Sequence, residues 1–472
     1  MKKPEITQRF FEAFDDPKVF DCGEFNLLKV AQDALKRKVG EKPQGIFKTH
    51  FDKNKTTLQL IYTLKFKRKD KSAREKLLQK LNANSNKKIG AIVPERYTQT
   101  EDGEMVHTYL GRFFEQVPRE DFFLAYAAKP KIKALIPETF YEEIFQAFEA
   151  DIPDRNEWKL IRNLQQCYKR VRKETRFSEE ELRDIKVGMD EFWKNYRVWE
   201  KVFRHLRLEK ALIIPGYQTE NIIAALRING VYVIEPQHGM ITTSSHFHVY
   251  PQIVRPVRKK ALFADEEWVF GEFWKEQLLK GAEFDESQVK ILGDYFIRNT
   301  TETSDNKEKL NAFKSRFEKL VLIGTQTNRH PYFIEYVKFL APLYLKKRPE
   351  VGIVVKPHPI EKQDVYKSIS DFDNVFFCHM NLDYLYQHCD TYLSMYSNTL
   401  YEASKHRHLK LFALSVPEWS ELVEDVVKSG VAKKVTKGTD VLDVSEPADF
   451  VENGNKFFDT INLSAFSIHN ST

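Results

Sequence analysis

His238 stands where an apolar segment ends, and this placement gives it the chemistry of a general base. The run 231–234 is typical of a buried strand, and the glycine after the histidine would allow a tight turn. A neutral imidazole can take the proton of a sugar hydroxyl. We therefore predict that His238 activates an acceptor hydroxyl. The residues expected to contact that acceptor, or to support His238, are Gln237, Gly239, His246, His248 and Tyr250.

Two short patterns raise the question of a bound metal ion. His246 and His248 form an H-x-H sequence, but no third ligand accompanies them at a clear spacing. The one D-x-D sequence, 371–373, lies between an expected helix and the start of an expected strand, which is typical of a turn. We therefore predict chemistry that needs neither a metal ion nor a cofactor.

Lys356 and His358 follow a second apolar run, 351–355, and the prolines after each of them end the strand. Both side chains can hold a diphosphate through charge-assisted hydrogen bonds. His358 could also protonate a departing phosphate. The alternative is a strand ended by proline with an incidental histidine.

Small polar residues end a third run, 391–397, where a helix is expected to begin. The free N–H groups of a helix start suit a phosphate, and Glu402 one turn later could accept hydrogen bonds from ribose hydroxyls. Ordinary capping explains Ser397 alone. Gly324, at a further strand end, would let a ligand approach the backbone, although it also fits an ordinary turn. The predicted catalytic residues are His238 and His358, and the predicted donor-binding residues are Gly324, Thr325, Gln326, Lys356, Pro359, Ser394, Ser397, Asn398, Thr399 and Glu402.

Short apolar runs that alternate with amphipathic stretches must position these residues. Between 319 and 430 the alternation is regular, which is typical of a parallel sheet covered on both faces. Between 86 and 294 it is less regular, and there we expect a strand at 261–265 and a helix at 266–281. Ligands bind outside the carboxyl ends of parallel strands. Two such domains would therefore face a shared central cleft.

The length of 472 residues is too great for one core. The expected parts are an N-terminal helical and basic extension at 1–85, a Rossmann-like acceptor domain at 86–294 with a helical insert at 151–209, a linker at 295–315, a Rossmann-like donor domain at 316–440, and a C-terminal tail helix at 441–472.

Composition narrows the class of protein. Four scattered cysteines and no signal-like segment favour a reducing, cytoplasmic location. The formal net charge is +6, and basic residues cluster at 65–76, 255–260 and 345–350. Such clusters are either plain solvated surface or a means of binding anionic lipid at the inner face of the cytoplasmic membrane. They form no stripe interleaved with aromatic residues, so nucleic acid is not an expected partner.

The order of these motifs resembles the GT-B glycosyltransferases of bacterial capsule and lipopolysaccharide assembly. The resemblance extends to bacterial sialyl- and polysialyltransferases and to CDP-glycerol glycerophosphotransferases. It covers roughly residues 205–430 and rests on "IEPQHG", "ILGD", "IGTQ", "VVKPHP" and "SMYSNTLYEA". In those families an HP motif, here 358–359, binds the donor phosphate, and a serine-rich turn, here at 394–399, also binds the donor.

The base position departs from one branch of this resemblance. The sialyltransferases carry an acidic pair before glycine where this chain has 237–239, whereas the glycerophosphotransferases carry a histidine–glycine pair. The one "EDG" sequence of the chain, at 101–103, is typical of a hairpin turn. The chain therefore matches the glycerophosphotransferases more closely at this position.

The resemblance implies an inverting, metal-independent enzyme. It would move a sugar from a nucleotide-activated donor to a cell-surface polysaccharide or lipid-linked glycan. The favoured donor is a CMP-sugar. One alternative is transfer of a glycerol- or ribitol-type polyol phosphate. Another is a non-catalytic nucleotide-sugar-binding module of a capsule assembly complex. A UDP-sugar 2-epimerase would need acidic residues around the sugar, and the sequence pattern places none there.

Overall fold

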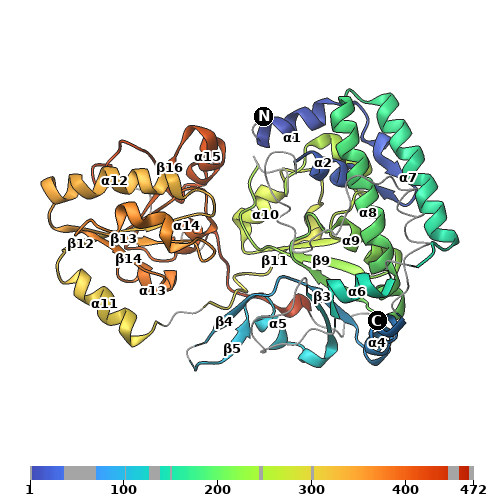
Figure 1. Cartoon of the computed structure of the whole chain (residues 1–472), viewed down its shortest axis with the longest axis horizontal. Coiled ribbons are helices and arrows are strands. Elements are labelled where there is room, and N and C mark those ends of the chain that lie inside the picture. Colours follow the sequence, from blue (N-terminus) through green and yellow to red (C-terminus); the bar gives the residue numbers. More distant parts are fainter. Residues whose placement is uncertain are drawn as a thin grey trace.

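Two parallel sheets organise the chain into two α/β domains (Figure 1). The computed structural model describes residues 3–36, 71–100, 102–126, 139–148, 151–243, 248–298, 302–444 and 456–466. The N-terminal sheet has the order β11-β10-β9-β8-β3-β6-β7, and the C-terminal sheet has the order β14-β13-β12-β15-β16-β17. Helices pack on both faces of each sheet, so the predicted GT-B class of two Rossmann-like domains is confirmed.

The strands are short and their inward residues are apolar. In the N-terminal sheet they are β3 Ile89–Ile92, β6 Phe122–Tyr126, β7 Thr139–Phe140, β8 Lys210–Ile213, β9 Tyr232–Pro236, β10 Glu266–Val269 and β11 Val289–Ile291. In the C-terminal sheet they are β12 Lys319–Gly324, β13 Val351–Lys356, β14 Val375–Phe377, β15 Thr391–Ser394, β16 Lys410–Ser415 and β17 Lys433–Thr436. A separate hairpin, β4 Tyr97–Gln99 and β5 Met105–His107, flanks the "EDG" sequence.

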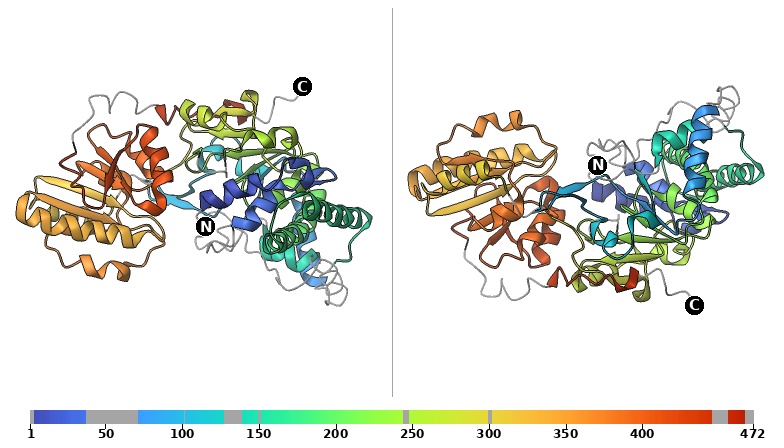
Figure 2. Two further views of the ribbon diagram at one scale, coloured as in Figure 1. Left: turned by 90° about the horizontal axis from the view of Figure 1, so that it is seen from above. Right: turned by 90° about the horizontal axis from the view of Figure 1, so that it is seen from below.

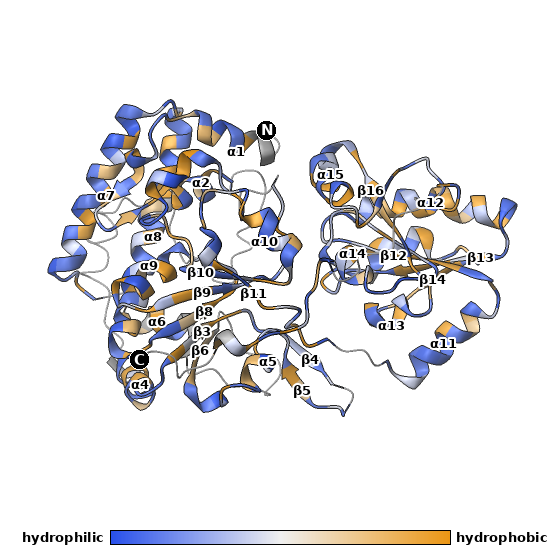
Figure 3. Ribbon diagram, turned by 180° about the vertical axis from the view of Figure 1, so that it is seen from behind, coloured by the Kyte–Doolittle hydropathy of each residue, from blue (hydrophilic) through white to orange (hydrophobic). Residues whose placement is uncertain are grey.

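The helices of the N-terminal domain include two long ones in the segment 151–209. Those described are α1 Lys3–Glu12, α2 Leu28–Lys36, α4 Lys71–Ala83, α5 Gly111–Phe114, α6 Tyr141–Phe148, α7 Arg155–Glu174, α8 Glu179–His205, α9 Glu220–Ile228 and α10 Glu272–Leu278. Capping boxes at Asp154 and Ser178 start the two long helices. Most of α7 is hydrophilic (Figure 3), whereas α8 is largely buried and packs against α2 and α9.

The helices of the C-terminal domain alternate with its strands. They are α11 Ser304–Lys314, α12 His330–Lys347, α13 Leu382–Tyr386, α14 Asn398–Ala403 and α15 Ser420–Lys428. Within the described ranges, no helix combines the length and the apolar character that crossing a membrane would require.

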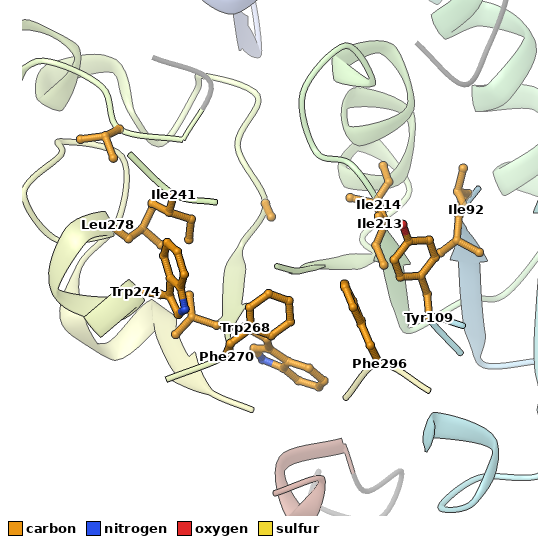
Figure 4. Close-up of a cluster of buried hydrophobic side chains, with 14 of the residues drawn as sticks. Ile92, Tyr109, Ile213, Ile214, Ile241, Trp268, Phe270, Trp274, Leu278 and Phe296 are labelled. Carbon is orange, nitrogen blue, oxygen red and sulfur yellow. The ribbon is translucent and has the colours of Figure 1, made fainter. Parts of the chain in front are cut away.

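The expectation of one helix at 266–281 is wrong. Its first residues form β10, which pairs with β9 on one side and β11 on the other, and α10 begins only after Gly271. Trp268 and Phe270 are buried within the cluster of hydrophobic side chains drawn in Figure 4. The expected strand at 261–265 contributes only an isolated bridge at Ala261. The helical periodicity belongs to α10 alone, and the preceding aromatic run is a buried central strand.

The segments expected as linker and tail differ from the sequence interpretation. The linker region contains α11, which begins where Thr303 Oγ1 accepts a hydrogen bond from Asn306 N–H at 3.3 Å. Phe313 of that helix stacks on Phe376 of the C-terminal sheet. In the described part of the tail, the helical element is a short 3-10 helix, Ser464–Phe466. This part of the tail lies against the N-terminal domain, where Asp459 N–H donates to Phe270 (Figure 2).

Candidate functional site

Two adjacent strands of the C-terminal sheet bring the lysine–histidine segment beside the residues that follow β12. Gly324 and Lys356 are paired in the register of β12 and β13. Thr325 Oγ1 accepts a hydrogen bond from the backbone N–H of His358 at 3.0 Å and donates one to Glu361 at 2.6 Å. These bonds fix the loop at the carboxyl end of β13.

The imidazole of His358 is held through one ring nitrogen. Its Nδ1 lies 3.0 Å from Thr327 Oγ1 and accepts a hydrogen bond from Ile360 N–H at 3.4 Å. Because Nδ1 accepts, the proton of the neutral ring lies on Nε2, which has no hydrogen-bond partner among the described residues. Burial lowers the pKa of His358. The ring is therefore neutral near pH 7 and can donate from Nε2.

Lys356 and the start of α14 lie at two further strand ends. The Lys356 ammonium donates to the Pro357 carbonyl at 3.0 Å, and burial lowers its pKa. Ser397 caps α14, because its Oγ accepts a hydrogen bond from Thr399 N–H at 3.3 Å. Strand β12 lies between β13 and β15, so the three strand ends are neighbours in the sheet.

Several predicted donor contacts are already bonded within the domain. Ser394 is fully buried and donates to the Gly324 carbonyl at 2.9 Å. A Cβ atom on Gly324 would lie 2.5 Å from the Tyr392 hydroxyl, so packing already requires glycine there. Gln326 accepts a hydrogen bond from Tyr396 N–H at 3.2 Å. These residues shape the strand ends, and their side chains are less available to a ligand than the sequence suggests.

Glu402 and Asn398 form a pair at the start of α14. Asn398 donates to Glu402 at 2.8 Å, and Arg298, from the segment between the domains, lies 3.4 Å from the same carboxylate oxygen. The carboxylate predicted to meet a ribose is thus already paired with a cation. Pro359, by contrast, is exposed beside His358.

His238 follows β9 in the N-terminal domain. Its Nε2 lies 3.2 Å from the Tyr217 hydroxyl, whereas its Nδ1 is buried and has no partner in the described ranges. Burial lowers the pKa of His238 to about 4, and the charge of Arg96 acts in the same direction. The imidazole is therefore neutral at pH 7, which is the protonation state that a base requires.

Arg96 is a site residue that the sequence pattern does not reveal. It follows β3, and its guanidinium lies 3.1 Å from the Tyr109 hydroxyl. Its positive charge lowers the pKa of both His238 and His358. One exposed guanidinium thus acts electrostatically on an imidazole from each domain. A lone arginine after a strand carries no spacing signal that could have predicted this.

Two residues beside His238 have structural roles. Gln237 is 1% exposed, accepts a hydrogen bond from Phe270 N–H and donates one to the Gly239 carbonyl, each at 2.8 Å. Its own carbonyl accepts a hydrogen bond from Tyr295 at 2.9 Å. Gly239 has no positive φ and open space around it, so the expected need for a glycine turn is absent. Gln237 is committed to holding the end of β9.

The histidines and the tyrosine further along this segment separate in space. Tyr250 is buried between Phe11 and Phe263, and is part of the core. His248 is half-buried, and its ring centroid lies 6.0 Å from that of His238. His246 lies outside the described residues.

Glu235 and Glu267 are paired in the register of β9 and β10, and both are buried. Burial raises the pKa of each carboxyl group. These two acidic residues lie near the predicted base, His238. No acidic residue was expected there from the sequence. Glu267 was missed because its segment was assigned to a helix. The apolar run at 268–270, ended by glycine, was the signal that could have identified it.

A small pocket of about 140 Å³ lies between the two domains. Loop 241–243 and α10 line one side, and α14 and α15 line the other. None of its lining residues is a predicted catalytic or donor-binding residue, so the pocket does not coincide with the two histidines.

No family model matches the chain, and no curated protein matches it. Among solved structures, it is similar to a UDP complex of MnaA from S. aureus, with a TM-score of 0.44 and 13% identity over 74% of this chain and 84% of that one. A putative UDP-N-acetylglucosamine 2-epimerase from Listeria monocytogenes has a TM-score of 0.48 and 13% identity, over 79% of this chain and 92% of that one. MurG from Acinetobacter baumannii has a TM-score of 0.39 and 11% identity, over 75% and 87%. The fold of the chain itself stands on the strand order of its two sheets.

Proposed function

We propose that the chain is an inverting GT-B glycosyltransferase. It transfers a sugar from a nucleotide-activated donor to a cell-surface polysaccharide or a lipid-linked glycan. The favoured donor is a CMP-sugar. The observation that carries this proposal is the pair of neutral imidazoles, His238 and His358, which follow strand ends in different domains and whose pKa values are both lowered by burial and by the charge of Arg96.

In this reaction His238 accepts the proton of the acceptor hydroxyl. The hydroxyl oxygen attacks the anomeric carbon, and the bond from that carbon to the nucleotide phosphate breaks. The electron pair leaves on the phosphate oxygen, where Nε2–H of His358 and the ammonium of Lys356 stabilise the charge. Because the ammonium of Lys356 and the Nε2–H donor of His358 stabilise this charge, the proposed reaction requires no divalent ion at the donor phosphate.

A panel of nucleotides tests the donor. We expect CMP to raise the melting temperature more than UDP or GDP, and CMP to be released from a CMP-sugar only when an acceptor glycan is present. A preference for CDP would favour the polyol phosphate transferase, because the glycerophosphotransferases also carry a histidine–glycine pair at the position of the base. Nucleotide binding without any release would favour a non-catalytic module. If none of the four nucleotides binds, the proposal is wrong.

The adjacent carboxyl groups of Glu235 and Glu267 favour a second candidate, a UDP-sugar 2-epimerase. Such an enzyme would exchange the C2 proton of a UDP-sugar with solvent in the absence of any acceptor. Proton NMR of UDP-N-acetylglucosamine with the protein in deuterated water distinguishes the two. A glycosyltransferase leaves the C2 signal intact, whereas an epimerase removes it.

Replacement of His358 by alanine should weaken donor binding about 10–100-fold, because a charge-assisted hydrogen bond contributes about 1.5–3 kcal/mol. Calorimetric titration with the cognate nucleotide measures this, and the wild-type affinity should be the same in EDTA. His388→Ala is the matched control, since that histidine is bonded to the Tyr384 carbonyl of its own helix region. Equal affinity of the His358→Ala variant and the wild type would remove His358 from the donor site.

Binding to anionic membranes should depend on the end of α12. In the cluster at 255–260, Arg255 and Arg258 are both paired with Asp285, which reduces their attraction for lipid. Lys346 and Lys347 are exposed at the end of α12, and each basic residue near an anionic surface contributes about 1 kcal/mol. Sedimentation with anionic vesicles should therefore fall in high salt and in the Lys346→Glu/Lys347→Glu variant. Equal sedimentation with neutral and anionic vesicles would contradict this.

A further inference from the structure

Glu235, Glu267 and His248 form a group at the carboxyl end of the N-terminal sheet, and the proposed transfer reaction uses none of the three. The two glutamates occupy paired positions on the neighbouring parallel strands β9 and β10, so their side chains lie on the same face. One possible ligand atom from each of the three residues lies within 4.8 Å of the other two. Like charges at directly opposite strand positions destabilise a sheet unless something compensates them.

The charge around this group is unbalanced. Asp33, Glu220 and Glu283 are also buried nearby, so five buried carboxyl groups lie around this group. Two buried lysines, Lys29 and Lys36, act on His248 through their charge. Lys29 lies 3.5 Å from Glu220 and donates to the carbonyls of Gly216 and Leu262. No contact within 4 Å joins it to Glu235 or Glu267 in the described ranges.

The carboxyl groups of Glu235 and Glu267 are close enough for a side-chain hydrogen bond, which would need a proton between them. The side chain of Glu267 is 2% exposed, and its Oε1 has no hydrogen-bond partner in the described part of the chain. Glu235 accepts one bond, from Gly216 N–H at 2.7 Å. A buried carboxylate oxygen without a partner is costly, and native structures rarely leave one so. The missing partner must be a proton or a cation.

We propose that Glu235, Glu267 and His248 bind one divalent metal ion of the first transition row, zinc or manganese. Carboxylate oxygens and imidazole nitrogens are both ligands of such ions, and a site with three protein ligands leaves coordination positions open. The imidazole disfavours magnesium and calcium, which prefer oxygen ligands. A divalent charge compensates the two adjacent carboxylates and supplies the partner that Glu267 Oε1 lacks.

The ion would lie in the acceptor domain and beside the proposed base. The ring of His248 lies 5.6 Å from that of Tyr217 and 6.0 Å from that of His238, measured between centroids. An open coordination position there suits an oxygen of the acceptor. The donor phosphate contacts come from the other domain, so this site is separate from them and its occupancy does not depend on the transfer reaction.

Metal binding by the full-length protein, stripped with a chelator, tests this site. Titration with Zn²⁺ and with Mn²⁺ should show one ion per chain, and the ion should raise the melting temperature. In the Glu267→Gln variant the affinity should fall at least about 100-fold, since even residues that only support a metal ligand contribute 10–100-fold. Glu286→Gln, at a side chain that is 80% exposed, is the control and should bind the ion as the wild type does.

The melting temperature without metal shows whether each variant is folded. Glu267→Gln should melt at or above the temperature of the metal-free wild type, because it removes a buried charge and keeps the shape. Binding that is equal in Glu267→Gln and the wild type would overturn the proposal. Absence of Zn²⁺ and Mn²⁺ binding by the wild type would also overturn it and would identify a shared proton as the partner. Both outcomes are measured as metal binding, so they do not depend on whether the chain transfers a sugar.

Discussion

Replacement of His238 by alanine should reduce turnover by about 10²–10⁴-fold, the range for loss of a general base. The affinity for the donor nucleotide should barely change, because His238 belongs to the N-terminal domain and the donor contacts come from the C-terminal one. Tyr217 fixes the ring through Nε2 at 3.2 Å. Initial rates at saturating donor, together with calorimetric donor affinity, measure the two effects separately.

A matched control distinguishes loss of the base from loss of structure. His205 is exposed at the end of α8, and its Nδ1 lies 2.6 Å from the Lys201 carbonyl, so His205→Ala should leave turnover unchanged. His238→Asp should retain part of the activity if a carboxylate can serve as the base. If His238→Ala lowers turnover, donor affinity and melting temperature together, the residue has only a structural role. Near-normal turnover of a folded His238→Ala protein would end the base hypothesis.

The pH dependence of the reaction follows from the pKa of this base. Burial and the charge of Arg96 lower the pKa of His238 to about 4. The active, neutral form is therefore present above this pKa, and kcat/KM should stay level from pH 8 to about pH 5 as far as His238 is concerned. It should fall as the pH drops toward 4. Arg96→Gln should move this fall to higher pH, because a neighbouring positive charge no longer opposes protonation.

The carboxyl ends of the C-terminal strands were predictable because their pattern is regular. Each apolar run there is short and is followed at once by glycine, proline or small polar residues. Both the strand and the residue at which it ends can therefore be identified from the sequence. The sequence therefore placed Lys356, His358 and Ser397 at adjacent strand ends. It could not show that Ser394 is buried and bonded to a backbone carbonyl, because an inward and an outward serine look alike in a sequence.

The N-terminal half of the site was less predictable, for two physical reasons. Glu267 lies on a strand whose apolar run merges with the periodicity of α10, and the longer helical pattern hid the strand. Arg96 and Lys29 reach the site from segments far away in sequence. A single sequence records such long-range charge contacts only as isolated basic residues, so the pairing of charges had to come from the structure.

Lys29 gives the N-terminal segment a defined role and leads to the largest expected effect on stability. Helix α2 packs against α8, and Lys29, 3% exposed, lies 3.5 Å from Glu220. Lys29→Met keeps the aliphatic chain and removes the charge. The free energy of unfolding should fall by about 3–5 kcal/mol, because a buried carboxylate loses its partner. Lys260→Met, at a half-exposed lysine 3.8 Å from Asp21, should cost less than about 1 kcal/mol.

Urea unfolding, monitored by tryptophan fluorescence, measures this loss of stability in the N-terminal domain. The buried tryptophans of the N-terminal domain are Trp193, Trp199, Trp268 and Trp274. If the charge is responsible, the double variant Lys29→Met/Glu220→Gln should recover much of the lost stability, as expected for two residues that interact directly. A double variant as unstable as Lys29→Met alone would instead assign the loss to packing of the lysine stem against Phe263.

The difference between Lys29→Met and the wild type should widen as the pH rises. Burial raises the pKa of Glu220 to about 7, and the charge of Lys29 opposes that shift. Without Lys29 the folded-state pKa rises further, so Glu220 keeps its proton in the folded variant. A group with a raised pKa contributes stability that is present below its unfolded pKa and is lost as the pH rises through the folded value. The variant should therefore be closest to the wild type at pH 5 and least stable relative to it above pH 7. A stability difference that is equal at pH 5 and pH 8 would mean that the ammonium of Lys29 does not compensate Glu220.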